Sequence, residues 1–123
     1  MNLVVAWLLI AVGFVMGFVL GLNFHREDWL GGYGSRKRRL YRLGHIATIA
    51  LAMINILFYF TAQTLPHPNP PLEIASWGFI IGAVTMPLCC FWMAHDQRAR
   101  AVFVVPVLSL AGSALLVFRE VLR

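Results

Sequence analysis

Four long apolar runs, each free of Asp, Glu, Lys and Arg, constrain the fold of this chain more than any other feature. They cover residues 2–23, 45–64, 74–94 and 101–118. A helix rises about 1.5 Å per residue, so about 20 residues cross the roughly 30 Å hydrocarbon core of a bilayer. The runs therefore predict an all-α, polytopic membrane protein, in which residues 1–123 form one domain with four transmembrane helices in an up-down bundle.

The composition excludes an ordinary soluble domain. Hydrophobic residues make up 60% of the chain and charged residues only 12%, whereas soluble domains are about 45–50% apolar and about 25% charged. A soluble domain of this size keeps much of its surface in water and cannot bury so much apolar area in one core. The sequence also shows no acid pair, no nucleophile with a base and no phosphate-binding loop, which favours a role other than catalysis.

Lys and Arg are distributed unevenly around the apolar runs. Six lie between the first and second runs and two between the third and fourth, whereas the C-terminus holds two. Short loops rich in Lys and Arg stay in the cytoplasm. The count of eight against two predicts a multi-pass protein of the cell inner membrane with both termini outside the cytoplasm.

The polybasic segment between the first two runs is a candidate contact with lipid. Each Lys or Arg close to an anionic leaflet contributes about 1 kcal/mol of binding free energy. We expect this segment to lie on anionic lipid headgroups rather than on nucleic acid, because no nucleic-acid-binding module accompanies it. The proposed lipid-facing basic residues are Arg36, Lys37, Arg38, Arg39 and Arg42.

Small residues recur at every fourth position in three of the runs. Gly13, Gly17 and Gly21 fall on nearly one stripe of the first run, Gly78 and Gly82 repeat the spacing in the third, and Ser109 and Ser113 repeat it in the fourth. Such a stripe lets another helix backbone approach closely. It predicts helix packing within the bundle, or packing with another copy or another membrane protein.

The second run carries a polar face inside an otherwise apolar helix. His45, Thr48, Asn55 and Tyr59 return to one side of a helix at their spacings. Polar groups in hydrocarbon need hydrogen-bond partners, so we expect this face to point into the bundle. There it either joins helices by hydrogen bonds or lines a binding site.

Three histidines lie near the predicted cytoplasmic boundary. His25 follows the first run, His45 opens the second and His95 follows the third. The pair His45 and His95 are candidate ligands of haem b, and His25 adds a candidate transition-metal ligand, with Glu27 or Asp28 near. The alternative is that each imidazole hydrogen-bonds to backbone, water or phosphate at the membrane interface.

The first half of the chain resembles a group of uncharacterised small bacterial inner-membrane proteins. The residues that carry this resemblance are Gly21-Leu22, His25, Trp29-Leu30-Gly31-Gly32-Tyr33, Arg38-Arg39, Arg42-Leu43-Gly44-His45-Ile46-Ala47 and Asn55. The resemblance implies a bacterial inner-membrane location and no particular chemistry.

Together these features predict an accessory or assembly protein of the membrane, which acts by packing with itself or with a larger membrane complex. The rival hypothesis is a haem- or metal-binding redox protein that uses His45 and His95.

Overall fold

The computed structural model describes residues 1–123, and all of its regular elements are helical. Four helices are long and apolar enough to span a membrane, as the apolar runs predict. In chain order the elements are α1 (Asn2–Leu22), η1 (Trp29–Gly31), α2 (Arg36–Gln63), α3 (Pro70–His95), η2 (Gln97–Phe103) and α4 (Val104–Val121), where η marks a short 3-10 helix.

The second long helix begins earlier than the apolar run that predicted it. The Ser35 side chain accepts a hydrogen bond from the backbone N–H of Arg38 at 3.1 Å, and α2 starts at Arg36 rather than at His45. Such a cap satisfies one of the N–H groups that have no partner in the first turn of a helix. Asn69 caps α3 in the same way. The basic segment is therefore the first part of α2 and not a loop.

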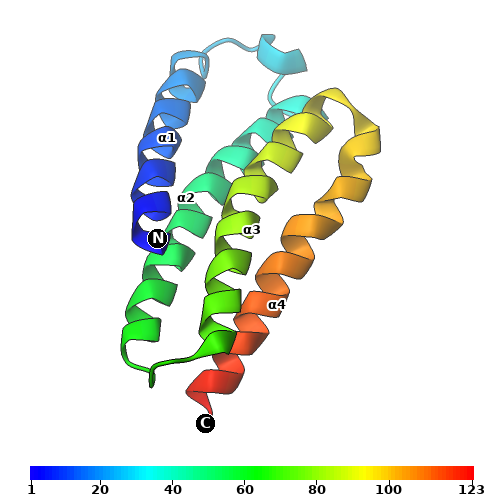
Figure 1. Ribbon diagram of the computed structural model, residues 1–123. Coiled ribbons are helices and arrows are strands. Elements are labelled where there is room, and N and C mark those ends of the chain that lie inside the picture. The colour runs from blue at the N-terminus through cyan, green and yellow to red at the C-terminus, as the bar shows by residue number, and fades with distance from the viewer.

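The four long helices lie in an open row. Figure 1 shows that the chain turns back at each connection, with α2 and α3 in the middle and α1 and α4 at the two sides. Each helix contacts the next one in the chain, but α1 and α4 do not contact each other. In the most apolar stretch of each span, 11% of the residues are buried in α1 and in the span formed by η2 and α4, against 28% in α2 and 39% in α3. The row thus leaves most of α1 and α4 uncovered.

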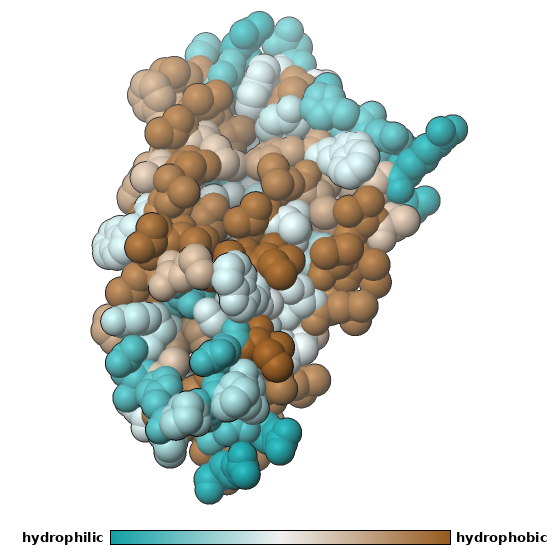
Figure 2. Space-filling model, in the orientation of Figure 1, coloured by the Kyte–Doolittle hydropathy of each residue, from teal (hydrophilic) through white to brown (hydrophobic).

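The uncovered surface is an apolar belt. In Figure 2 hydrophobic residues fill the middle of the molecule, and hydrophilic residues gather at its two ends. Exposed members of the belt include Trp7, Phe14 and Phe18 of α1 and Leu108 and Leu115 of α4. A continuous apolar belt on a protein surface indicates contact with a membrane or with other proteins.

Glycines set the closest helix approaches in the row. A Cβ atom at Gly13 would collide with Ile49, and one at Gly17 would crowd His45, so both glycines lie at the α1–α2 interface. A Cβ atom at Gly21 would meet nothing within 4 Å, so Gly21 does not lie against a neighbouring helix of this chain. For Gly21 the predicted helix contact is therefore left only with another chain, and it stays a prediction.

The third helix packs on its neighbours in the same manner. A Cβ atom at Gly78 would collide with Ser113 of α4, and one at Gly82 would collide with Leu110 of α4. Ser109 of α4 also donates a hydrogen bond to the Gly78 carbonyl at 2.9 Å. Small residues thus bring α3 and α4 together, the arrangement that their spacing predicts.

Candidate functional site

A buried hydrogen-bond junction joins α1, α2 and α3. The Asn2 amide donates to Asn55 Oδ1 at 2.8 Å, and Ser76 Oγ donates to Asn2 Oδ1 at 2.5 Å. The Asn55 amide also donates to the Phe79 carbonyl of α3 at 3.3 Å. Asn55 is fully enclosed and Asn2 is 5% exposed. Because buried amides are costly without partners, this junction fixes the three helices relative to one another.

The junction explains one part of the predicted polar face. Thr48 is buried and donates to the Gly44 carbonyl of its own helix at 2.8 Å, while Asn55 reaches both neighbouring helices. Tyr59 is half-buried and lies beside a pocket. The partners Asn2 and Ser76 were missed in the sequence. Their only signal is that each is a polar residue in a run that is otherwise apolar.

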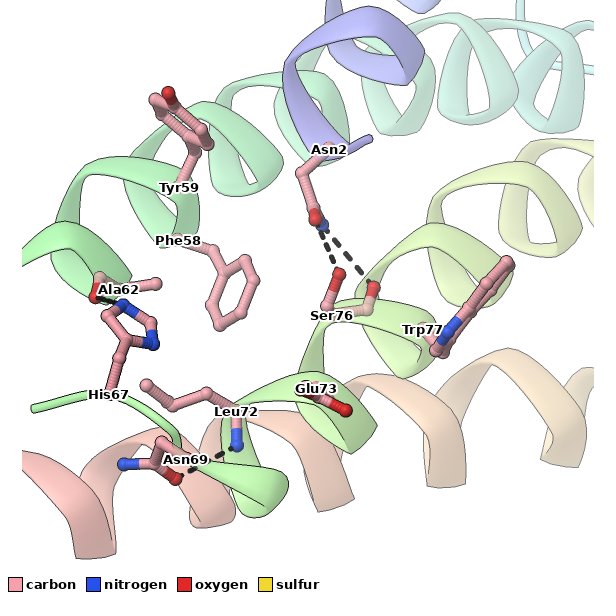
Figure 3. Close-up of a pocket in the computed structure, with 10 residues that line it drawn as sticks. All are labelled: Asn2, Phe58, Tyr59, Ala62, His67, Asn69, Leu72, Glu73, Ser76 and Trp77. Carbon is pink, nitrogen blue, oxygen red and sulfur yellow. Dashed lines mark hydrogen bonds between the residues drawn. The ribbon is translucent and has the colours of Figure 1, made fainter. Parts of the chain in front are cut away.

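A pocket of about 330 Å³ lies beyond the junction, on the side away from the basic loops. It lies between α2 and α3, and Asn2 of α1 is part of its lining. Figure 3 shows Asn2 entering this space from α1, with Phe58 between α2 and α3. The remaining lining includes Tyr59, His67, Leu72, Glu73, Ser76 and Trp77.

The histidines face different neighbours. His45 lies against Gly17 of α1, and its Nδ1 is buried without a hydrogen-bond partner. His95 pairs with the Tyr41 hydroxyl, with 2.9 Å between Nε2 and the oxygen. His25 is exposed in the first loop. The free Nδ1 of His45 suits a ligand, but His95 is turned to Tyr41 at the α2–α3 interface and does not complete a haem pair with it.

The structure also does not assemble the candidate metal site. No three His, Cys, Asp or Glu side chains converge closely enough to hold a metal ion. Cys89 and Cys90 are reduced and buried in α3. The haem and metal hypothesis thus stays a prediction. Of its candidate ligands, His45 has a buried ring nitrogen, Nδ1, without a hydrogen-bond partner.

Arg38 is buried at the basic end of the protein, where it contacts the first loop. Its guanidinium lies 5.6, 5.6 and 5.3 Å from the ring centres of Phe24, Trp29 and Tyr33. It also donates to the carbonyls of Phe24 and Arg26, both at 3.2 Å. Arg38 is only 3% exposed, so its assignment to a lipid-facing patch is wrong. Aromatic faces and carbonyls replace water around a guanidinium well, which explains the burial.

The other basic residues divide into two groups. Arg42 stacks on Tyr33, 4.3 Å from the ring centre, and Arg36 donates to the Met93 carbonyl at the end of α3. Arg39 is exposed, and Lys37 is half-exposed. Three of the five basic residues of this segment are therefore engaged within the protein, because Arg38 and Arg42 pack on rings of the first loop and Arg36 bonds to the end of α3.

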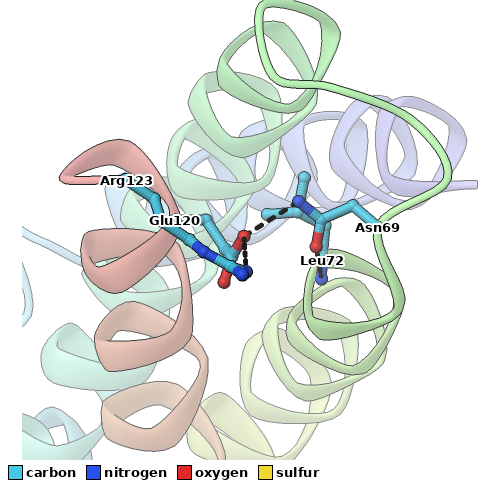
Figure 4. Close-up of polar contacts among 4 residues, drawn as sticks. All are labelled: Asn69, Leu72, Glu120 and Arg123. Atoms are coloured by element: carbon cyan, nitrogen blue, oxygen red, sulfur yellow. Dashed lines mark hydrogen bonds and ion pairs between the residues drawn. The ribbon is translucent and has the colours of Figure 1, made fainter.

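A second polar contact closes the opposite end. Glu120 of α4 is 7% exposed, and its Oε2 accepts a hydrogen bond from Asn69 at 3.1 Å. Arg123 approaches the same oxygen at 3.7 Å, as Figure 4 shows. Glu120 Oε1 is buried without a partner. This contact ties the end of α4 to the proline-rich connector between α2 and α3, and no spacing rule in the sequence indicated it.

Comparisons with known proteins add no assignment. No protein family, curated protein or solved structure matches the chain. The resemblance to small bacterial inner-membrane proteins stays a prediction.

We expect Asn55→Ala to lower the free energy of unfolding by about 1–3 kcal/mol, because the Asn2 amide loses its buried acceptor. Reversible unfolding in mild detergent measures this value. Asn23→Ala is the matched control, since the Asn23 amide donates only to the Val19 carbonyl of its own helix. Combining Asn2→Ala with Asn55→Ala should cost less than the sum of the single changes. Equal losses from Asn55→Ala and Asn23→Ala would contradict the junction.

We expect Arg38→Lys to loosen the first loop, because an ammonium cannot stack on three rings and bond two carbonyls as a guanidinium does. Chymotrypsin should then cleave after Phe24, Trp29 or Tyr33 several-fold faster than in the unchanged protein. Arg39→Lys is the control, since Arg39 is exposed. The same cleavage rate for both variants would show that Arg38 does not hold the loop.

Proposed function

We propose that this protein is a four-span integral membrane protein of the cell inner membrane, which acts as an accessory or assembly component by packing with a second copy of itself. In this proposal the four helices cross the bilayer in alternate directions. The apolar belt and the hydrophilic ends support membrane insertion. The excess of Lys and Arg in the first and third loops supports a cytoplasmic position for both loops and an external position for both termini.

The observation that carries the association is a groove between α3 and α4. Its volume is about 740 Å³, and Gly78, Ser109, Gly112 and Ser113 lie along it. A Cβ atom at Gly112 would meet nothing within 4 Å, although one at Gly78 in the same groove would collide with Ser113 of α4. Within a membrane, helices associate by close packing of small residues, because lipid tails remove the hydrophobic driving force between helices. A groove of this kind fits a further transmembrane helix.

Exposed leucines beside the groove are placed to contact a second copy of the protein. Leu108 and Leu115 of α4 are 66% and 68% exposed and lie four and three residues from Gly112. In a two-fold contact between two α4 helices, these leucines of one copy fit beside Gly112 of the other. The surface is thus self-complementary, and we favour a second copy over a helix of another protein.

The basic end supports an orientation on an anionic leaflet. Arg39 on α2 and Arg98 and Arg100 on η2 are exposed at the same end of the row. The rings of Phe24 and Tyr33 in the first loop pack edge to face, with 6.4 Å between their centres. Exposed Lys and Arg contribute about 1 kcal/mol each next to anionic lipid, so the end is suited to the cytoplasmic leaflet.

We expect reporter fusions to place the first loop and the C-terminus on opposite sides of the membrane. A fusion after Ser35 should be active with a cytoplasmic reporter and inactive with an external one, and a fusion after Arg123 should give the reverse. The physical reason is the retention of the basic loops in the cytoplasm. The same compartment for both fusions would contradict a four-span arrangement.

We expect Gly112→Leu to reduce dimer formation at least tenfold, because the new side chain fills the place of the partner's leucines. A cysteine at Leu122, seven residues beyond Leu115, reports the dimer by short bismaleimide crosslinking in membranes. The chain's own Cys89 and Cys90 are buried, so the unchanged protein serves as background.

Gly21→Leu is the matched control for this experiment. A Cβ atom at Gly21, like one at Gly112, would meet nothing within 4 Å, so both positions have space for a side chain within one copy. Gly21→Leu should leave the dimer intact. Absence of a dimer in the parent Leu122→Cys protein, an undiminished dimer in Gly112→Leu, or capture of a different chain in its place would contradict self-association.

A further inference from the structure

An apolar crevice lies between α1 and α3 in the half of the row nearer the basic loops. Its volume is about 270 Å³, and its floor is α2, the helix between the two in Figure 1. Near the other end Asn2 bonds to Ser76 and joins α1 to α3, whereas no hydrogen bond joins these helices along the crevice. The lining consists only of hydrophobic residues: Val15, Met16, Val19 and Leu20 of α1, Tyr41 of α2 and Phe91 of α3.

The size and the chemistry of the crevice select a slender apolar group. Small-molecule sites usually measure about 300–1,000 Å³ and include several polar groups. This crevice is smaller, and its one hydroxyl, that of Tyr41, pairs with His95 at 2.9 Å. Val15 and Val19 are 65% and 49% exposed, so the crevice opens sideways along α1. A single acyl chain of a lipid, which reaches the crevice from the side, fits this space.

Hydrogen-bond donors lie one helical turn beyond the lining on all three helices. Asn23, Lys37 and His95 are each four residues from a lining residue of their own helix. That spacing places them on the same side of the helix and nearer the basic end. Lys37 is half-exposed, and His95 is exposed beside Tyr41. An amide, an ammonium and an imidazole can all donate to phosphate oxygens, so an apolar interior ends at groups that suit a phospholipid headgroup.

The charge of this end favours an anionic headgroup. Residues 24–44 and 95–100 hold eight Lys and Arg against three Asp and Glu. Asp96 follows His95, but it caps η2 by accepting from the Arg98 N–H at 2.9 Å, and the Arg98 and Arg100 side chains are exposed beside it. We infer that the crevice holds one acyl chain of an anionic phospholipid of the cytoplasmic leaflet, with the phosphate at Lys37 and His95. The inference rests on the proposed position of the basic end at that leaflet, but not on the proposed dimer.

Phosphatidylglycerol and phosphatidylcholine with the same acyl chains test the inference. Native mass spectrometry of the purified full chain, released from detergent, should show one retained phosphatidylglycerol per chain and at least tenfold less phosphatidylcholine. Equal retention of the two lipids, or retention of neither, would overturn the proposal. The measurement uses purified protein, so its failure is distinct from a failure of the reporter fusions, which test the direction of insertion.

A pair of matched variants on α1 tests the crevice itself. Val19→Trp puts a large side chain into the lining and should lower phosphatidylglycerol retention at least tenfold. Val12→Trp is the control, because Val12 is two turns away on the same side of α1, has a similar exposure of 42%, and does not line the crevice. Circular dichroism and size exclusion in detergent establish that both variants are folded. Equal retention by the two variants would overturn the proposal.

A second pair on α2 tests the position of the headgroup. Lys37→Gln should lower phosphatidylglycerol retention at least fivefold and leave phosphatidylcholine retention unchanged, because the anionic headgroup loses its ammonium partner. Arg39→Gln removes the same charge two residues further along α2, on a different side of the helix, where Arg39 is exposed. It should change retention less than twofold. An unchanged preference for phosphatidylglycerol in Lys37→Gln, or the same loss in both variants, would overturn the proposed site.

Discussion

The arrangement of α1, α2 and α3 depends on the buried junction of Asn2, Asn55 and Ser76. Amide groups in an apolar surrounding are stable only with partners, and here the three helices each supply a group to the same cluster. Asn2 and Ser76 of this cluster also line the pocket between α2 and α3. The interaction that joins the three helices therefore also forms part of the pocket.

The helices could be predicted from the sequence more accurately than their ends. Charge-free runs of about 20 residues are long enough to predict membrane-spanning helices without any knowledge of contacts. The apolar run that begins at His45 marks only the membrane span and not the start of α2 at Arg36, and Lys and Arg in the first turn of a helix are opposed by the helix dipole. The structure overcomes this cost by the Ser35 cap and by the aromatic residues around Arg38. Both effects depend on the folded loop, which a hydropathy pattern does not describe.

The site was predicted in part, and the missing part has a geometric reason. Periodicity placed Thr48, Asn55 and Tyr59 on one face, because that requires only the helical repeat. It could not identify Asn2 and Ser76, since contacts between helices depend on their relative shift and rotation. His45 and His95 show the same limit: the sequence indicates a similar depth for both, but one ring lies against α1 and the other is bonded to Tyr41.

The pocket and the α3–α4 groove are separate sites with one shared wall. Trp77 lines both, whereas Glu73 lines only the pocket and Gly112 only the groove. Each site therefore has a residue through which it can be changed alone. Trp77 is the one residue common to both linings, so a substitution of this indole changes both sites at once.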